Sequence, residues 1–515
     1  MCHDAAVQID DVVREAAART PGGLALVTEA GRATFAELDA EVDHLATRVL
    51  DATDPGDRVA ILSENRAGYV HAYYGVPRAG RILVPLNHRL HPEEWASALG
   101  RSGARLLLAE PDLLERLRVV LPDRSTPDPA SIETVDLSSP GLCSEARIPL
   151  PNAQTGQGAG GSEGAGGAGG VAWLVGTSGT TGTPKLAMLT HASLLAAVEA
   201  TLGARPVGDD DVLLTPFPLC HVAGYNVLVL HRRARPLVLM RRFDPLVLAG
   251  LVREHGVTML SLAPTMISML LDHPAVEDRD LATVRALGYG ASPIPGPVLR
   301  RVVERWDWDC SQGYGMTELS GNAVFLGPGD HRAAAAGDKR LLHAAGRPAP
   351  GVEVRLARAN AEILVRAPQV MAGYWQDPDA TARALRDGWL HTGDVGRVDA
   401  DGLLSIIDRA KDVIVSGGEN VASREVEDVL HRHPAVADVA VIGLPDERWG
   451  ERVCAVVVAR PGTTVTTDEL VDLARAHLAG FKAPREVVFL ADLPRNASGK
   501  VLKHRLREDL GPEPA

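Results

Sequence analysis

Short apolar runs alternate with longer segments of helical periodicity through most of the chain. The apolar runs lie at residues 58–62, 81–85, 105–109, 236–240 and 258–262. Runs of this length are typical of strands that are buried on both faces. Between them, apolar residues recur at helical spacing, for example over 92–99 and 244–255. The alternation of the two patterns predicts an α/β fold built from layers of parallel sheet and helix.

The same pattern indicates how the chain is divided. Residues 151–170 are a low-complexity stretch rich in Gly, Ala and Gln, which predicts a disordered connector and not a site. A polar, charged segment at 408–411 marks a boundary, and the roughly one hundred residues that follow are enough for a small separate domain. We therefore expect a large domain over residues 1–410 and a small one over 411–515.

The charge balance restricts the partners of the protein. The 515 residues include 53 basic and 66 acidic side chains, which gives a net charge of −13. A surface that binds nucleic acid would instead be basic. We therefore expect no nucleic acid partner.

Cysteine usage and the start of the chain indicate the compartment. The five cysteines are scattered and form no Cys-x-x-Cys pair, so neither a disulfide framework nor a zinc site is expected. The first residues lack a basic segment followed by an apolar one, and no apolar stretch reaches the length of a membrane span. The sequence predicts a soluble, cytoplasmic protein without a membrane span.

The most informative stretch is the loop from Gly176 to Lys185, which follows an apolar run at 171–175. Its glycines let backbone N–H groups approach a ligand, its hydroxyl side chains can donate hydrogen bonds, and Lys185 adds a positive charge. Such a loop can wrap a polyphosphate. The spacing differs from that of the P-loop because Thr183 and Pro184 stand before the lysine. A flexible linker is the alternative interpretation.

Further motifs follow the loop down the chain. They are Pro218-Leu-Cys-His-Val-Ala-Gly224, Gly288-Tyr-Gly-Ala-Ser-Pro293, Gln312-Gly-Tyr-Gly-Met-Thr-Glu318, Gly388-Trp-Leu-His-Thr-Gly-Asp394, Asp408-Arg-Ala-Lys-Asp412, Ser416-Gly-Gly-Glu-Asn420 and Pro494-Arg-Asn-Ala-Ser-Gly-Lys500. Together with the loop, this series resembles the adenylate-forming enzymes, which include acyl-CoA synthetases, peptide-synthetase adenylation domains and beetle luciferases. The resemblance implies a large N-terminal adenylate-forming domain of layered sheets and helices. It also implies a small, mobile α+β C-terminal domain that pivots at Lys411.

The resemblance implies a reaction in two steps. A carboxylate attacks the α-phosphorus of ATP to give an acyl-AMP and pyrophosphate, and a thiol then accepts the acyl group. The first step builds negative charge on the phosphates, so the site needs cations and hydrogen-bond donors. ATP, Mg²⁺ and coenzyme A are the implied cofactors. Catalytic roles are implied for Lys500, Thr317, Glu318 and His221, with the Glu318 carboxylate as the magnesium ligand, since Mg²⁺ prefers oxygen donors.

Cofactor contacts are implied for the phosphate loop, two segments beside the adenine, a ribose-binding pair and a glycine loop beside the thiol tunnel. In chain order these residues are Thr177, Ser178, Gly179, Thr180, Thr181, Gly182, Lys185, Gly290, Ala291, Ser292, Gln312, Gly313, Tyr314, Gly315, Met316, Thr317, Asp394, Arg409, Gly417, Gly418 and Glu419. Tyr314 would stack on the adenine, and Asp394 with Arg409 would bind the ribose hydroxyls. His221 would lie where the acyl and thiol tunnels meet, and a structural core histidine is the alternative for it.

The segment around His221 restricts the class of acid that can be the substrate. Residues 217–224 contain no Asp or Glu that could pair with a substrate ammonium, and an unpaired ammonium in an apolar pocket is unfavourable. Amino acids are therefore disfavoured, and an acyl-CoA synthetase acting on a carboxylic acid, with a fatty acid favoured, is expected. Small residues at 222–224, Gly288 and Gly290 would leave room for an alkyl chain of medium or greater length.

The chain departs from the family pattern at three places, one of which is Ala361-Glu362-Ile363 where Gly-Glu-Ile is usual. Leu186 stands where most members have glycine, and Ala422-Ser423 stands where Tyr-Pro is frequent. Three alternative functions stay open: an acyl-AMP ligase that loads a carrier protein, a coenzyme A ligase for an aryl or short-chain acid, and a catalytically silent binding protein. A homodimer also stays open.

Overall fold

The computed structural model describes residues 7–120, 131–136, 144–149, 170–177, 185–290, 294–342, 344–409, 412–416, 419–446, 449–495 and 500–511. The chain forms two compact units. The first unit is Met1–Glu353 with Val365–Leu390, and the second is Val354–Leu364 with His391–Ala515. A large mixed α/β part followed by a small C-terminal α+β part confirms the predicted fold class. The predicted connector, apart from Gly170, and the predicted pivot Lys411 lie outside the described residues, and the boundary after residue 410 stays a prediction.

One sheet of the first unit contains the strand that leads into the phosphate loop. Its described strands are β3 (Arg58–Leu62), β4 (Ile82–Leu86), β5 (Leu106–Ala109), β6 (Ser131–Asp136), β7 (Ser144–Pro149), β8 (Val171–Thr177) and β9 (Lys185–Thr190). They lie in the order β7-β6-β5-β3-β4-β8-β9 and are parallel except for the pairs β6-β7 and β8-β9. The strands predicted at 58–62, 81–85, 105–109 and 171–175 are confirmed.

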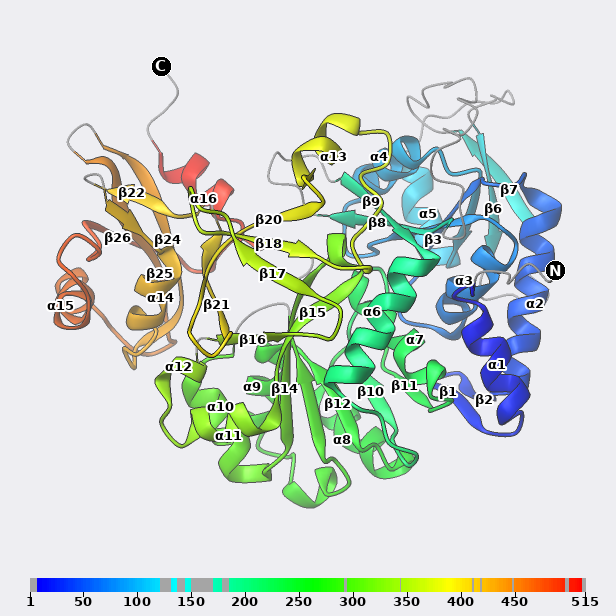
Figure 1. Ribbon diagram of the computed structural model, residues 1–515, viewed down its shortest axis with the longest axis horizontal. Helices are drawn as coiled ribbons and strands as arrows, with labels where there is room; N and C mark the ends of the chain where they lie inside the picture. The colour runs from blue at the N-terminus through cyan, green and yellow to red at the C-terminus, as the bar shows by residue number, and fades with distance from the viewer. Residues whose placement is uncertain are drawn as a thin grey trace. The chain divides into compact units, whose positions relative to one another are not determined.

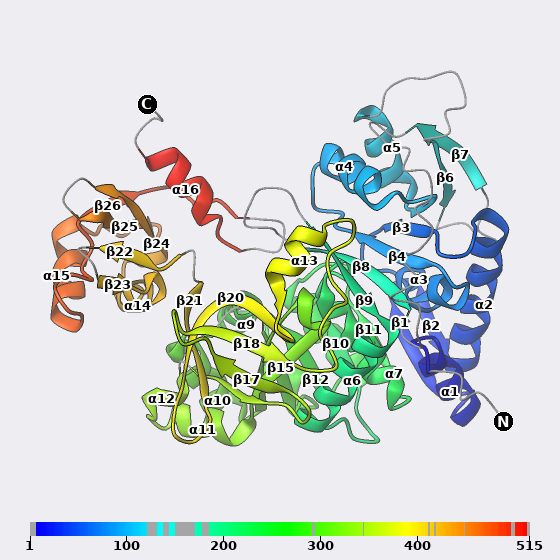
Figure 2. The same cartoon turned by 45° about the horizontal axis from the view of Figure 1, so that its top comes forward.

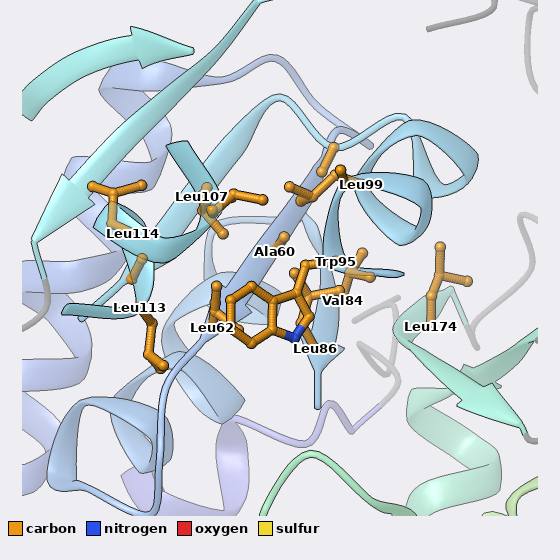
Figure 3. Packing of buried hydrophobic residues seen from close by; sticks show 14 of the residues in the cluster. Ala60, Leu62, Val84, Leu86, Trp95, Leu99, Leu107, Leu113, Leu114 and Leu174 are labelled. Carbon is orange, nitrogen blue, oxygen red and sulfur yellow. The ribbon is translucent and has the colours of Figure 1, made fainter. Parts of the chain in front are cut away.

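Helices α4 (Pro92–Ser102) and α5 (Pro111–Val120) pack on this sheet around Trp95 (Figure 3). Pro92 at the start of α4 and Gly103 after its end, with φ of 63°, are the residues that favour a helix start and stop at those positions. The Trp95 indole fills the centre of the apolar cluster, and its Nε1 donates to the backbone oxygen of Asn87 at 2.8 Å. The one polar atom of this buried ring is thus satisfied.

A second sheet of the first unit carries most of the predicted adenine-side and acyl-side residues. Its strands are β1 (Leu24–Thr28), β2 (Gly31–Thr34), β10 (Leu213–Thr215), β11 (Leu237–Leu239), β12 (Met259–Leu262), β13 (Ala286–Tyr289), β14 (Asp309–Met316), β15 (Gly321–Leu326) and β16 (Ala344–Pro348). They follow the order β2-β1-β11-β10-β12-β13-β14-β15-β16, with the strands from β1 to β14 parallel and both ends antiparallel. The strands predicted at 236–240 and 258–262 are confirmed.

Helices of the first unit cover these sheets (Figures 1 and 2). They are α1 (Asp11–Arg19), α2 (Phe35–Ala52), α3 (Ala67–Arg78), α6 (His191–Ala204), α7 (Tyr225–Arg232), α8 (Pro245–His255), α9 (Pro264–Asp272), α10 (Gly296–Trp306), α11 (Pro328–Ala335), α12 (Lys339–Leu342) and α13 (Pro378–Ala384), followed by the short strand β19 (Leu385–Arg386). Helix α6 packs against β15, and α11 packs against β14. Helix α8 matches the predicted helix at 244–255.

The second unit is built around a small sheet that contains both antiparallel and parallel strand pairs. Strands β17 (Glu353–Leu356), β18 (Glu362–Arg366) and β20 (Trp389–Val398) include residues of both units, and β21 (Leu404–Arg409), β22 (Ile414–Ser416), β23 (Glu419–Val421), β24 (Val436–Asp446), β25 (Gly450–Ala459) and β26 (Glu486–Phe489) follow. The helices are α14 (Ser423–Leu430), α15 (Thr467–His477) and α16 (Lys503–Leu510). Alternation along β24 places Val439 and Val441 in one apolar cluster and Ala440 and Ile442 in the other. Both faces of this sheet are therefore buried.

No helix within the described residues combines the length and the apolar character that crossing a membrane requires.

Candidate active site

Strands β8 and β9 hold the two ends of the phosphate loop. Thr177 ends β8 and lies opposite Lys185, the first residue of β9, in antiparallel register. The residues between them, among which Ser178, Gly179, Thr180, Thr181 and Gly182 were predicted to contact phosphates, lie outside the described residues. Leu186 is 6% exposed and packs in the same apolar cluster as Trp95. The leucine that replaces the glycine of the family pattern thus anchors one end of the loop in the core.

The segment around Tyr374 runs beside β9 and extends its backbone pairing. The N–H of Trp375 donates to the backbone oxygen of Leu186 at 2.8 Å, and Tyr374 forms an antiparallel bridge with Ala187. This pairing places Tyr374 next to Lys185, whose Nζ lies 5.0 Å from the centre of the phenol ring. A cation over an aromatic face at this distance is weakly attracted to it.

Glu318 lies in the short 3-10 turn η3 (Thr317–Leu319) that follows β14, and it is 7% exposed. The hydroxyl of Tyr374 donates to Glu318 Oε1 at 2.8 Å. Among the described residues, no lysine or arginine forms an ion pair with this carboxylate. Lys185, Tyr374 and Glu318 thus form a connected series, in which a neutral hydroxyl donates to the carboxylate.

Gln369 fixes the turn that carries Glu318. Its side-chain Nε2 donates to the backbone oxygens of Leu319 at 2.8 Å and Asn322 at 3.0 Å, and Gln369 is 1% exposed. Neither Gln369 nor Tyr374 was predicted from the sequence, because the segment that contains them has neither helical nor alternating periodicity.

At the adenine-side positions neighbouring strands approach so closely that only glycine fits. A Cβ added to Gly290 would lie 2.9 Å from the backbone oxygen of Gly313, and a Cβ on Gly313 or Gly315 would overlap atoms of β15. Since only glycine lacks that atom, other residues would force these strands apart. The structure places Gly290 next to Gly313, whereas Ala291 and Ser292 lie outside the described residues.

Tyr289 and Gln312 lie side by side on β13 and β14. The Tyr289 hydroxyl donates to Gln312 Oε1 at 3.2 Å and lies 2.8 Å from Nε2 of His331 on α11. Tyr289 therefore packs under the sheet on the side of α11. Tyr314 is 9% exposed, and Met316 ends β14.

His221 precedes the 3-10 turn η1 (Val222–Gly224), and its Nε2 is buried without a hydrogen-bond partner among the described residues. Burial, with a smaller effect from the positive charge of Arg89, lowers the pKa of His221 to about 4. The imidazole is therefore neutral at pH 7. The loop before it is held by Asn65, whose side-chain amide bonds backbone groups on both sides of Pro218 at 2.8 and 2.9 Å. Asn65 was not predicted from the sequence, since it is remote from every motif.

At the three glycines of the acyl side, neighbouring atoms already occupy the volume that a side chain would fill. A Cβ on Gly224 would overlap the hydroxyl of Tyr73, and a Cβ on Gly288 would overlap the guanidinium of Arg205. The position beside Gly290 is closed by the neighbouring strand. The expectation of room for a chain of medium or greater length at these glycines is thus wrong, because other side chains and backbone already fill the volume.

In the second unit, β20 and β21 pair Asp394 with Arg409 in register. Arg409 Nε lies 2.7 Å from Asp394 Oδ1, and Asp394 is 4% exposed. The backbone N–H of Asp394 donates to Thr392 Oγ1 at 3.1 Å, and that hydroxyl donates to the backbone oxygen of Ile363 at 2.8 Å. The structure thus brings the two residues of the predicted ribose pair into direct contact.

Lys500 is exposed, in the stretch of chain that precedes α16. An isolated β-bridge joins Arg495 to Val501, and the N–H of Leu502 donates to the backbone oxygen of Pro494 at 2.7 Å. These contacts hold the two ends of the segment that presents the lysine.

Of the predicted thiol-side residues, Glu419 is the first residue of β23. Glu419 is exposed there, and Gly417 and Gly418 lie outside the described residues. The nearby departure from the family pattern has a structural role: the N–H and the hydroxyl of Ser423 both donate to Asp408 Oδ2 at 2.6 Å. A proline at this position could not donate the first of these bonds.

Two family models match the chain. The model described as AMP-binding enzyme covers residues 13–375, and that of the AMP-binding enzyme C-terminal domain covers residues 425–500. The chain is 37% identical over 494 residues to a feruloyl-CoA synthase of Amycolatopsis sp, with 93% of this chain and 94% of that protein covered.

Two further curated relatives match nearly the whole chain. A methyl-dioxo-octahydro-indenyl-propanoyl:CoA ligase of Mycobacterium tuberculosis is 38% identical over 517 residues, covering 97% of each chain. The fatty acid–acyl-carrier-protein ligase ScoC of Streptomyces coeruleorubidus is 34% identical over 502 residues, covering 94% of this chain and 93% of that one.

Among solved structures, the o-succinylbenzoate CoA synthetase of Bacillus subtilis, in complex with its acyl-adenylate intermediate, matches with a TM-score of 0.81 and 30% identity. The match covers 96% of this chain and 97% of that one.

Proposed function

Because the chain belongs to the AMP-binding enzyme family, we propose that it joins a carboxylic acid to coenzyme A through an acyl-AMP intermediate. It is an acid–thiol ligase, and ATP, Mg²⁺ and coenzyme A are its cofactors. The observation that carries the proposal is the Glu318 carboxylate, which is buried, held by Tyr374 and paired with no cation among the described residues.

The donor set around Glu318 fits magnesium. Among the described residues no cluster of three or more His, Cys, Asp or Glu side chains could hold a metal ion. Mg²⁺ commonly binds to one or two carboxylates and completes its shell with substrate phosphates and water. Tyr374 uses one acceptor position of Glu318, and a carboxylate offers about four. Bound here, the ion would neutralise charge on the phosphates of ATP.

The residues of the first unit would act on the phosphates. Lys185 lies at the end of the phosphate loop, where its ammonium can stabilise the negative charge that grows on the departing pyrophosphate. Thr317 lies next to Glu318, and its hydroxyl would donate to the α-phosphate. Both roles depend on donors that are fixed before the reaction begins. The pairing of β8 with β9 holds the backbone at Lys185, and the Gln369 contacts hold the turn that contains Thr317.

The residues of the second unit would bind the ribose and act in the first step. Asp394 can accept hydrogen bonds from ribose hydroxyls through the acceptor positions that Arg409 leaves open. Lys500 would stabilise the negative charge of the carboxylate and the α-phosphate during adenylation. In the later step the thiol forms a bond to the acyl carbon and AMP leaves with the electrons of the broken C–O bond; no role in that step is assigned to Lys500.

The acid itself is proposed to have a compact cyclic or aromatic tail, in place of the favoured fatty acid. Tyr73 and Arg205 fill the volume beside Gly224 and Gly288, which leaves less room for a long flexible chain. The relatives named for feruloyl and indenyl-propanoyl groups support such an acid. The relative named for a fatty acid keeps an alkyl acid as the alternative.

A panel of acids tests the proposal directly. Pyrophosphate release and product mass would be measured with ATP, Mg²⁺ and cinnamic, hydroxycinnamic, indole-type and graded alkyl acids, with and without coenzyme A. We expect acid-dependent pyrophosphate release and an acyl-CoA product. No acid-dependent release across the panel would contradict the proposed activity.

A carrier-protein ligase is the second candidate, because ScoC is named for that acceptor and matches nearly the whole chain. The same panel separates the two functions. Accumulation of acyl-AMP with no acyl-CoA for any acid would favour the carrier-protein acceptor.

A further inference from the structure

Arg205 is the first residue after helix α6, and its side chain points between two elements of the acyl side. Its Nη2 donates to Oδ1 of Asn226 on the first turn of α7 at 2.8 Å. Its Nη1 lies against Gly288 of β13 so closely that a Cβ there would overlap it. Asn226 is five residues beyond His221, and Gly288 is two residues before Gly290. The guanidinium therefore lies between the element that carries His221 and the strand that leads to the adenine side.

The charge of Arg205 has no counter-ion among the described residues. Its one hydrogen-bond partner there is the neutral amide of Asn226, its Nε is buried with no partner, and the nearest ionisable group that affects it is the phenol of Tyr225. Burial lowers the pKa of the guanidinium. A guanidinium has five N–H donors, so most of its hydrogen-bonding capacity is unused.

Arg78 and Arg81 of the first unit, by contrast, have partners for their charge. Arg78 pairs with the carboxylates of Asp10, Asp39 and Asp43, the last two at 2.6 and 2.7 Å. Arg81 is 6% exposed and donates to two backbone oxygens and one hydroxyl. A charge that is partly removed from water and lacks such partners destabilises a fold. If Arg205 only filled space, an apolar side chain of similar length would do so without the cost of removing a charge from water.

We propose that Arg205, together with Asn226, determines which acid is activated by binding an oxygen acceptor on the tail of the acid, away from the reacting carboxylate. The acceptor is a second carboxylate, a carbonyl or a phenolic oxygen, since each can accept the parallel N–H donors of a guanidinium. The inference rests on the proposed function, because it assigns the acid that the ligase uses. Gly288 is part of this site, since only glycine leaves room for the guanidinium.

Matched pairs of acids test this role. Each pair has the same carbon skeleton with and without the distal oxygen: octanedioic against octanoic acid, 4-hydroxycinnamic against cinnamic acid, and a keto acid against its deoxo counterpart. The measurement is kcat/KM for pyrophosphate release. We expect kcat/KM of the wild-type enzyme to be about 10-fold or more higher for the oxygenated member of at least one pair. This is the factor that one hydrogen bond to a charged group contributes.

The variants then show which residue produces the preference. Arg205→Met should lower kcat/KM for the oxygenated acid by about 10- to 100-fold and change that of its partner by less than about 3-fold. Gly288→Ala, which displaces the guanidinium, should weaken the same preference. Arg205→Lys should retain part of it. Arg233→Met is the matched control, because Arg233 is exposed at the other end of α7, and it should leave every ratio unchanged.

Thermal unfolding without ligand separates ligand binding from a structural role. Removing this partly buried, unpaired charge should leave the melting temperature of Arg205→Met equal to or above that of the wild type. A clear drop in melting temperature with equal losses for both members of every pair would overturn the inference. So would a wild-type enzyme that activates acids but never prefers the oxygenated one. If no acid is activated at all, the proposed function fails instead.

Discussion

Glu318 in the first unit and Asp394 in the second are both nearly fully buried carboxylates, and they differ in what they contact. Glu318 is 7% exposed and accepts from the neutral hydroxyl of Tyr374 at 2.8 Å. Asp394 is 4% exposed and lies 2.7 Å from the guanidinium of Arg409. A neutral hydroxyl donates to the first carboxylate, whereas the second carboxylate is paired with a guanidinium.

This difference predicts different ligands for the two carboxylates. A buried negative charge without a cation is unfavourable until a metal ion or another cation arrives, so Glu318 is suited to a divalent ion. An ion-paired carboxylate has little attraction left for a cation but still accepts hydrogen bonds from hydroxyl groups, so Asp394 is suited to a ribose. The two lysines of the candidate site differ in a similar way: Lys185 lies over the ring of Tyr374, whereas Lys500 is exposed.

The largest effect is expected for Lys500→Ala, which tests whether the second unit contributes charge to the first step only. Losing one donor that stabilises developing charge typically costs about 100-fold or more. We expect that loss in acid-dependent pyrophosphate release, with thiol transfer from a supplied acyl-adenylate largely intact. Unchanged pyrophosphate release would remove Lys500 from the first step, and equal losses in both steps would remove the distinction between them.

Glu318→Gln tests whether the uncompensated charge is what binds magnesium. The amide keeps an oxygen ligand but carries no charge. We expect adenylation to slow by about 100-fold and the half-saturating Mg²⁺ concentration to rise, with little change in the melting temperature. An unaltered magnesium titration and rate would make Glu318 a structural residue.

Asp394→Asn makes the corresponding change at the carboxylate that is paired with Arg409. We expect KM for ATP to rise by about 10-fold, the size of one hydrogen bond to a charged group. The half-saturating Mg²⁺ concentration, measured at saturating ATP, should stay the same. A shift of the magnesium titration as large as that of Glu318→Gln would show that the two carboxylates do not differ as their partners suggest.

Local sequence patterns were sufficient to predict the strands and to recognise the motifs in their order along the chain. The buried runs at 58–62 and 258–262 became β3 and β12, and the apolar run before the loop became β8. Thr177 and Lys185 were expected at one loop, and they lie in register across β8 and β9. The strand predictions succeeded because strand burial is determined by residues close together in the chain.

Contacts between distant segments could not be predicted in the same way. Glu318 and Tyr374 are 56 residues apart, and nothing in either segment indicates that a hydroxyl and a carboxylate will meet. Gly288 was expected to leave room for substrate, yet Arg205 occupies that volume from another element. A glycine in a sequence shows that a side chain is absent, but only the fold shows which neighbour fills the space.

The smallest effect is expected for Tyr374→Phe, which removes the neutral donor that holds Glu318 while keeping the ring beside Lys185. Without that hydrogen bond the carboxylate is held less firmly for a metal ion. We expect the half-saturating Mg²⁺ concentration to rise by about 5-fold, the factor that the loss of one ordinary hydrogen bond produces, and adenylation to slow by a similar factor.

Tyr69→Phe is the matched control, because the Tyr69 hydroxyl is buried and bonds nothing among the described residues. In the Glu318→Gln background Tyr374→Phe should add no further loss, since residues in one network are not additive. An additive loss would mean that Tyr374 acts through Lys185 and the phosphate loop instead.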